Sequence, residues 1–287
     1  VDYSIEQQRD IYNKMCREFF AGYPEGVSAS DGQVPSRDHQ IPIRHYVMAG
    51  ADPAACIIYY HGGGFVVGGL ESHDDVCAEL CARTGFPVTS VDYRLAPEYT
   101  FPADFDDAFS GFSYVADRSD LPVVLVGDSA GSNLAAAVSH ATRSQDHKPV
   151  GQVLIYPGLG SDLTQGTFIE HADAPLLTTK DTTFYKTIRT GGDEALLRNP
   201  ACTPLSDTDF SNLPPTVIIS AECDPLSGDG KTYCDRVNEA GGKAHWINET
   251  GLVHGYLRAR HSVERARESF SRIVDAASAL GKGDWLY

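Results

Sequence analysis

A serine, an aspartate and a histidine follow three separate apolar segments of this sequence, in the chain order Ser129, Asp224, His254. A serine hydroxyl is a poor nucleophile by itself, and it needs a histidine as base, which a carboxylate in turn orients. Each of these residues alone is more often an ordinary turn or surface residue. Their joint placement after strand-like segments predicts a nucleophile, an acid and a base at one edge of a sheet.

Ser129 lies in the pattern G-D-S-A-G at residues 127–131, between a strand-like run and a helix-like run. Residues 123–126 have the composition of a buried strand, and residues 133–138 favour helix. A strand, G-x-S-x-G and a helix describe a nucleophile elbow, whose flanking glycines permit a very tight turn. The serine then lies at the positive end of the helix with its Oγ exposed. The alternative, a glycine-flanked serine in an ordinary turn between strand and helix, is disfavoured by this context.

Asp224 and His254 each follow a later strand-like run, at residues 216–221 and 244–248. This is the order in which such folds supply the acid and the base. Glu222 is close enough to replace Asp224 as the orienting carboxylate. Seven of the other histidines fit the required order or placement less well: His61, His73, His140, His147, His171, His245 and His261.

A second glycine-rich turn, His61-Gly62-Gly63-Gly64-Phe65, follows the apolar run 55–60. Consecutive glycines let backbone N–H groups approach a ligand closely and point in one direction. After a strand they could form an oxyanion hole, with His61 holding the loop by hydrogen bonds. A flexible loop or an anion-binding nest are the alternatives, and a phosphate-binding loop is disfavoured because no Gly-Lys-Ser/Thr follows.

Short apolar runs alternate with helix-like segments through much of the chain. Strands are expected at 40–48, 55–60, 87–91, 123–126, 151–156, 216–221 and 244–248, and helices at 3–20, 71–84, 101–118, 133–138, 181–189, 226–240 and 262–280. The polar connection 21–35 is expected to lie outside the core. This rhythm predicts an α/β fold with a mostly parallel central sheet flanked by helices. It breaks at 159–213, which we interpret as an insertion that caps the active site.

The bulk composition argues against several classes of protein. The chain has 287 residues, 42% hydrophobic and 22% charged, which is typical of globular domains. A formal net charge of −16 argues against nucleic acid or an anionic membrane as partner. No apolar run approaches the roughly 18 residues of a membrane helix, and no signal peptide opens the sequence. Seven irregularly spaced cysteines complete no zinc site and are expected to be reduced and mostly buried, which fits a cytoplasmic setting.

Five motifs together resemble the hormone-sensitive-lipase-like branch of the α/β-hydrolases, in particular its bacterial esterases with a G-D-S-A-G elbow. They are H-G-G-G-F at 61–65, D-Y-R-L-A-P-E at 92–98 with F-P-A at 101–103, G-D-S-A-G at 127–131, D-P-L at 224–226 and H-G-Y at 254–256. Their combination and order are highly specific to this family. In one departure, Ser227 stands where the family often has an arginine.

The resemblance implies an α/β-hydrolase fold with a triad of Ser129, Asp224 and His254. The implied oxyanion donors are the N–H groups of Gly63, Gly64 and Ala130, and the positions expected to border the substrate are Phe65, Asp128, Leu226 and Val253. A cap of residues 1–38 and 159–213 would cover a catalytic domain of residues 39–158 and 214–287. No metal or cofactor is expected. The expected partner is a small-molecule ester, and a homodimer through a sheet edge or the terminal helix is left open.

We therefore expect a serine carboxylesterase that hydrolyses short-chain acyl esters through an acyl-enzyme. Short chains are favoured over triglycerides because the sequence shows no long apolar lid. An amide or formamide hydrolase, such as an arylformamidase, would use the same residues. A non-catalytic small-molecule binding protein is the expectation from a different class, and the intact set Ser129, Asp224 and His254 disfavours it.

Overall fold

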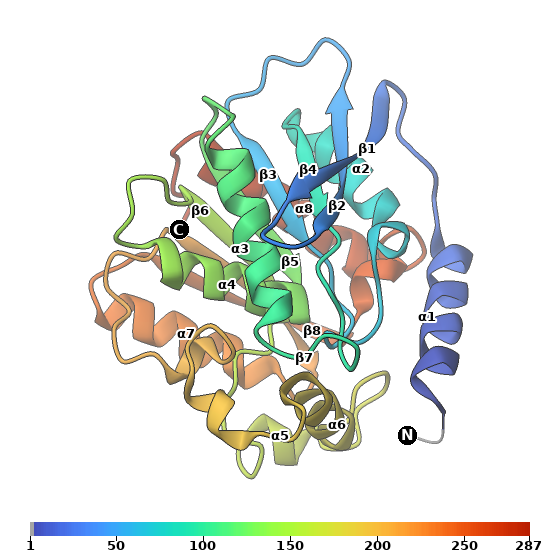
Figure 1. Ribbon diagram of the computed structural model, residues 1–287, viewed down its shortest axis with the longest axis vertical. Helices are drawn as coiled ribbons and strands as arrows, with labels where there is room; N and C mark the ends of the chain where they lie inside the picture. The colour runs from blue at the N-terminus through green and yellow to red at the C-terminus, as the bar shows by residue number, and fades with distance from the viewer. Residues whose placement is uncertain (1–2) are drawn as a thin grey trace.

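A computed structural model describes residues 3–287, and a sheet of eight strands forms its centre (Figure 1). The strands are β1 (Val27–Pro35), β2 (Gln40–Met48), β3 (Cys56–Tyr60), β4 (Val88–Val91), β5 (Val123–Asp128), β6 (Gly151–Ile155), β7 (Thr216–Cys223) and β8 (Ala244–Val253). They lie in the order β1-β2-β4-β3-β5-β6-β7-β8. β2 pairs antiparallel with β1 and β4, whereas the pairs from β4 to β8 are parallel. The predicted mostly parallel sheet is confirmed. Residues 1–2 of the predicted N-terminal cap segment lie outside the described residues.

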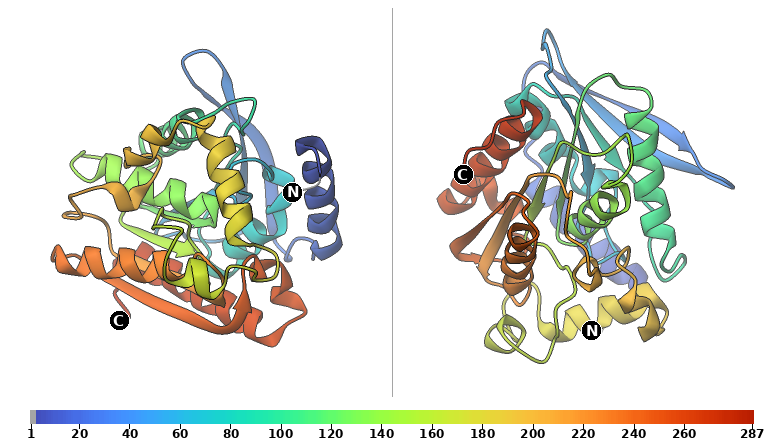
Figure 2. Two further views of the ribbon diagram at one scale, coloured as in Figure 1. Left: turned by 90° about the horizontal axis from the view of Figure 1, so that it is seen from below. Right: turned by 90° about the vertical axis from the view of Figure 1, so that its left-hand side faces the viewer.

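Helices cover both faces of this sheet (Figures 1 and 2). They are α1 (Ile5–Phe19), α2 (Asp74–Thr84), α3 (Ala103–Ala116), α4 (Ala130–Thr142), α5 (Thr167–Glu170), α6 (Thr179–Thr190), α7 (Ser227–Glu239) and α8 (Glu264–Gly281), with short 3₁₀ turns at Leu70–Ser72, Glu194–Arg198, Pro204–Ser206 and Tyr256–His261. Side chains of α2 and α8 pack into the core on one face. Side chains of α3, α4 and α7 pack into the core on the other.

The central strands are buried on both faces, which explains why they read as unbroken apolar runs. In β3, Ile57 and Tyr59 belong to the core beneath α2 and α8, whereas Ile58 and Tyr60 belong to the core beneath α3 and α4. Successive side chains of a strand point to opposite faces, so a strand with helices on both sides needs an apolar residue at every position.

Helix α1 runs along the side of the molecule, and α5 and α6 lie together at one end of it (Figures 1 and 2). Arg9 fastens α1 to the segments that follow β3 and β4. Its guanidinium donates hydrogen bonds to the main-chain oxygens of Val66 (2.8 Å) and Ala96 (3.1 Å), and it forms an ion pair with Glu98 (2.7 Å). Two of the four hydrogen bonds from Arg9 therefore go to main-chain atoms, and the other two go to the Glu98 carboxylate.

The expectation that residues 21–35 form an irregular connection is wrong for Val27–Pro35, which form β1. β1 is the edge strand and pairs only with β2, and Val34 is its one fully buried side chain among the described residues. An edge strand with serine, aspartate, glycine and glutamine facing water lacks the alternation that sequence patterns detect. β8 also continues to Val253, past its predicted end at Asn248.

Candidate active site

Ser129 occupies the turn between β5 and α4 in a strained backbone conformation. Its φ angle is 55°, which is rare for a residue with a side chain. The turn fits only because its flanks are glycine: a Cβ atom on Gly131 would lie 1.9 Å from the Tyr60 oxygen, and one on Gly127 would lie 2.4 Å from the Gly131 carbonyl carbon. The Ser129 N–H donates to the Ile155 oxygen of the neighbouring β6 (2.8 Å), which fixes the turn against the sheet.

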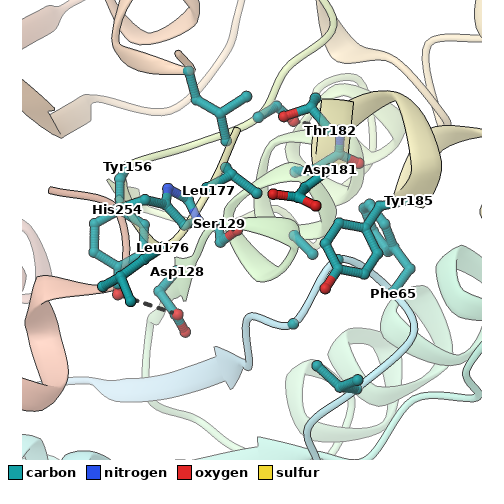
Figure 3. A pocket seen from close by; sticks show the side chains of 18 of the residues that line it. Phe65, Asp128, Ser129, Tyr156, Leu176, Leu177, Asp181, Thr182, Tyr185 and His254 are labelled. Atoms are coloured by element: carbon teal, nitrogen blue, oxygen red, sulfur yellow. Dashed lines mark hydrogen bonds between the residues drawn. The ribbon is translucent and has the colours of Figure 1, made fainter. Parts of the chain in front are cut away.

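The structure brings Ser129, His254 and Asp224 into one hydrogen-bonded chain. His254 Nε2 lies 2.8 Å from Ser129 Oγ, and His254 Nδ1 lies 2.7 Å from Asp224 Oδ2. Asp224 is fully buried, and its second oxygen accepts the N–H of Leu226 (2.9 Å). The imidazole is therefore held in one orientation, with Nε2 directed at the serine (Figure 3).

Glu222, the alternative acid, lies elsewhere: its carboxylate accepts the N–H of Gly251 (2.8 Å). His61 is fully buried beneath the glycine-rich loop, where its ring stacks on Tyr93 at 4.3 Å and its Nδ1 donates to the Gly62 oxygen (2.8 Å). Burial, with the nearby charge of His73, lowers the pKa of His61 to about 4. A neutral His61 therefore braces the loop from below.

The N–H groups of Gly63, Gly64 and Ala130 have no protein acceptor among residues 3–287. Gly63 and Gly64 both adopt positive φ angles (131° and 61°), which turn the loop sharply beside Ser129. Ala130 is the first residue of α4, where an N–H has no partner within the helix. These groups border the same cavity as Ser129 and could meet a negatively charged oxygen there.

Asp128 borders this cavity, but protein donors already occupy its carboxylate. Oδ1 accepts from the Tyr59 hydroxyl (2.7 Å) and the Gly62 N–H (2.9 Å), and it lies 3.1 Å from His73 Nε2. Burial alone would raise the pKa of Asp128, but the charge and hydrogen bond of His73, the Tyr59 hydroxyl and Arg258 outweigh burial and hold that pKa well below its usual range. The carboxylate thus ties the elbow to the glycine-rich loop.

A cavity of about 800 Å³ opens above Ser129. Phe65, Leu226 and Val253, three positions expected to border the substrate, line it. The apolar part of the remaining wall comes mainly from α1 and from residues 163–177, with one ring from α6: Ile11, Tyr12, Met15, Phe19, Leu163, Phe168, Leu176, Leu177 and Tyr185. Such a cavity has the size and lining that proteins use for small organic ligands.

Helix α6 lies directly against the glycine-rich loop. A Cβ atom on Gly64 would lie 2.6 Å from the Tyr185 ring, so the ring fills the space that a side chain would need. One turn later, the Arg189 guanidinium lies 3.6 Å from the centre of the Phe65 ring. Arg189 is buried and forms an ion pair with Asp104 at 2.6 Å.

Several of these contacts were not predicted from the sequence. The Tyr156 ring lies 4.8 Å from that of His254, whereas the sequence predicts Tyr156 only as the last residue of a strand. Arg189 was taken only as the end of a helical patch in the insertion. The sequence carried no signal for this contact, because α6 is largely polar and the partner Asp104 is distant in sequence.

The described residues show no group of three or more His, Cys, Asp or Glu side chains placed to hold a metal ion. Within residues 3–287, no helix has both the length and the apolar character needed to cross a membrane. All seven cysteines are free, and all but Cys223 are buried, as expected from the sequence.

The chain is similar to known esterases over most of its length. An α/β-hydrolase-fold family model matches residues 57–258. The chain is 32% identical to an ethyl acetate hydrolase of Pseudomonas putida, over 86% of this chain and 81% of that protein. It is 35% identical to the carboxylesterase NlhH of Mycobacterium tuberculosis, over 81% and 76% of the two chains.

Solved structures agree with this relationship. An esterase of Pyrobaculum calidifontis superposes with a TM-score of 0.91 at 32% identity, covering 97% of this chain and 94% of that one. A thermostable carboxylesterase cloned from a metagenomic library gives the same TM-score and identity, covering 99% and 98%. The protein therefore belongs to the α/β-hydrolase family, in its hormone-sensitive-lipase-like branch of carboxylic ester hydrolases.

Proposed function

We propose that this protein is a serine carboxylesterase that hydrolyses short-chain acyl esters through an acyl-enzyme on Ser129. One observation carries the proposal: the elbow serine, His254 and the buried Asp224 form a continuous hydrogen-bonded chain at the base of an apolar cavity. The similarity to carboxylesterases along most of the chain supports the choice of esters as substrates.

In the first half-reaction, Ser129 Oγ attacks the ester carbonyl carbon while His254 Nε2 takes the hydroxyl proton. Asp224 stabilises the imidazolium that results. The tetrahedral intermediate collapses, and the departing alkoxide takes the proton from Nε2 and leaves as the alcohol. In the second half-reaction, His254 takes a proton from water, the hydroxide attacks the acyl-enzyme, and the acid leaves as Ser129 recovers its proton.

The N–H groups of Gly63, Gly64 and Ala130 are proposed to bind the oxygen that becomes negative in both intermediates. Each such donor contributes on the order of 3–4 kcal/mol of transition-state stabilisation in enzymes where it has been removed. Packing around the loop fixes its backbone before the substrate arrives, since a Cβ atom on Gly63 would lie 2.1 Å from the Val67 oxygen and one on Gly64 would lie 2.6 Å from the Tyr185 ring.

Helix α1 and residues 159–213 are proposed to form the cap, because both line the cavity above Ser129. The cavity itself does not limit the substrate to short acyl chains. The cavity is larger than an acetyl or butyryl group requires, and Ile11 and Leu176 border it while remaining 51% and 71% exposed. Chain length therefore has to be measured directly.

Initial rates on p-nitrophenyl esters from acetyl to palmitoyl, with the wild type and Ser129→Ala, test the proposal. We expect rapid turnover of short chains that disappears in Ser129→Ala. Activity that persists in the variant would refute the elbow as active site. Rates that keep rising beyond dodecanoyl would overturn the short-chain limit alone, and faster hydrolysis of matched anilides or formamides would favour the amide hydrolase. Ligand binding without turnover of any of these compounds would point to a binding protein.

Two further expectations from the sequence stay predictions. A homodimer would be detected by light scattering during size-exclusion chromatography. A cytoplasmic setting would be detected by fractionating the cells that produce the protein.

A further inference from the structure

Asp181 brings a carboxylate into a cavity whose walls are otherwise mostly apolar. It is the third residue of α6, and its side chain lines the same cavity as Ser129 and His254. Figure 3 shows the carboxylate on the cavity side of the helix, between Ser129 and the Tyr185 ring. From the sequence, this residue is predicted only to lie on a helix.

Only one oxygen of this carboxylate is used by the protein. Oδ2 accepts two hydrogen bonds, from the N–H and the Oγ1 of Thr178 (3.0 and 2.7 Å), which cap the start of α6. Oδ1 accepts no hydrogen bond from residues 3–287, and no lysine, arginine or histidine of that range lies within ion-pair distance. The cap fixes the side chain and leaves its negative charge unpaired.

Most other charged groups around the cavity already have partners. Arg189 is paired with Asp104 (2.6 Å). Arg258 donates to the Ser72 oxygen (2.9 Å) and to the Tyr12 hydroxyl. Asp229 accepts from the main-chain N–H groups of Leu159 and Gly160 (2.6 and 2.8 Å). Arg189 and Asp104 therefore compensate each other's charge, whereas Arg258 and Asp229 have neutral partners and carry charges of opposite sign.

Lys186 also lines the cavity and lies five residues beyond Asp181. At about 100° per residue, the two side chains leave α6 roughly 140° apart, and they form no ion pair. The Tyr185 ring lies one turn beyond Asp181 on α6, and Phe65 and Tyr12 add aromatic rings to the same cavity. A carboxylate among aromatic rings is the chemistry that binds alkylammonium groups.

We propose that Asp181 makes this enzyme selective for esters that carry a positive charge, as an ammonium group, and disfavours esters that carry a carboxylate. The inference rests on the proposed esterase function. An unpaired carboxylate attracts a cation and repels an anion across the poorly screened space of an apolar cavity. We expect about a tenfold preference in kcat/KM for a cationic ester over its neutral isostere, which corresponds to about 1.4 kcal/mol.

Two matched pairs of substrates test this proposal. The first pair varies the alcohol and compares acetylcholine with its neutral isostere, 3,3-dimethylbutyl acetate. An anionic acetate ester, 4-acetoxybutanoate, is measured beside them. The second varies the acyl group: ethyl 4-(trimethylammonio)butanoate against ethyl 5,5-dimethylhexanoate. Each pair has one shape and differs in one charge. We expect the wild type to have the higher kcat/KM for the cationic ester in the pair whose varied group, alcohol or acyl, lies against α6. Among the three acetates, we expect the anionic 4-acetoxybutanoate to be hydrolysed most slowly.

Asp181→Asn is the decisive variant, because the asparagine oxygen can still accept both hydrogen bonds from Thr178. We expect it to abolish the tenfold preference, to raise kcat/KM for the anionic acetate, and to leave the neutral esters within about twofold. Asp146→Asn is the matched control, since this exposed residue precedes β6 at the opposite end of the parallel strands. It removes the same charge and should leave every ratio unchanged.

Three outcomes would overturn the inference. The first is an equal kcat/KM for the cationic and the neutral ester of both pairs in the wild type. The second is a preference for the cationic ester that Asp181→Asn retains. The third is a preference for the cationic ester that Asp181→Asn leaves in place and Lys186→Met abolishes. Each presupposes that the neutral esters are hydrolysed. If no ester is hydrolysed, or if Ser129→Ala retains turnover, the proposed function itself fails, so the two failures are distinguishable.

Discussion

The buried ion pair between Arg189 and Asp104 offers the sharpest test of how α6 holds the glycine-rich loop. Both side chains are about 95% or more buried, and their closest atoms are 2.6 Å apart. Arg189 also donates to the Cys202 oxygen (2.7 Å) and covers the face of Phe65. Arg189→Met keeps the length and apolar stem of the side chain but removes the charge and all its donors.

The cost of this change follows from what it leaves behind. Removing one partner of a buried ion pair strands the other charge in a low-dielectric environment, which costs about 3–5 kcal/mol. We expect Arg189→Met to lose that much free energy of unfolding. Asp104→Asn should lose a similar amount, and the double variant should lose at least about 2 kcal/mol less than the sum, because no unpaired charge remains.

Equilibrium unfolding in urea, followed by tryptophan fluorescence, measures the free energy of unfolding of the wild type, the two single variants and the double variant. Initial rates on p-nitrophenyl butyrate, measured in parallel, should show kcat reduced about tenfold or more in Arg189→Met with little change in KM, because Phe65 adjoins the proposed oxyanion donors Gly63 and Gly64. Losses that add within about 0.5 kcal/mol would mean that the two side chains are not coupled. An unchanged kcat would mean that α6 does not position the loop.

Three further predictions concern the acid, the elbow and the loop. Asp224→Asn should lower kcat by about 10⁴-fold without unfolding the protein, since His254 loses the acceptor that fixes its tautomer. Glu222→Gln should keep kcat near that of the wild type. If steady-state kinetics showed the reverse pattern, Glu222 would be the acid. Gly131→Ala should yield little folded protein, as judged by circular dichroism, because its Cβ would collide with the Tyr60 oxygen; a folded and active variant would contradict the tight packing of the elbow. Because the pKa of His61 is lowered to about 4, the unfolded chain binds a proton at His61 between pH 6.5 and about 4 that the folded protein does not bind. The contribution of His61 to the free energy of unfolding is therefore complete above pH 6.5. It falls by about 3 kcal/mol as the pH is lowered toward 4. Urea midpoints of the wild type and His61→Gln should therefore converge across this pH range, and a constant difference would show that His61 does not carry this dependence.

The parts that could be predicted from the sequence are those encoded by local patterns. Strand β3 and the first four residues of β5 are apolar at every position because helices cover both faces of the sheet, and such runs are visible without a structure. The glycines around Ser129 carry an equally local signal, since the turn excludes a side chain there.

Other features depend on partners that are distant in sequence. β1 forms because β2 offers it an edge, and its own residues show little of this. The neighbours of Asp128, which are Tyr59 and His73, come from β3 and the start of α2, and Arg189 meets Asp104 only after the chain between them has folded. The sequence predicted a helix at Asp181 but no role for its side chain, and only the placement of α6 brings its carboxylate to the cavity.

The way Arg9 holds α1 has a consequence for how this protein can diverge over evolutionary time. Its guanidinium binds the main-chain oxygens of Val66 and Ala96, and substitutions at those two positions leave a main-chain oxygen in place. This half of the Arg9 attachment is thus independent of side-chain substitutions in the loops beneath the helix, whereas the half made to the Glu98 carboxylate is not. Residues of α1 that face the cavity, such as Ile11 and Met15, can then be exchanged one at a time, so substrate range can change while the nucleophile and its partners stay fixed.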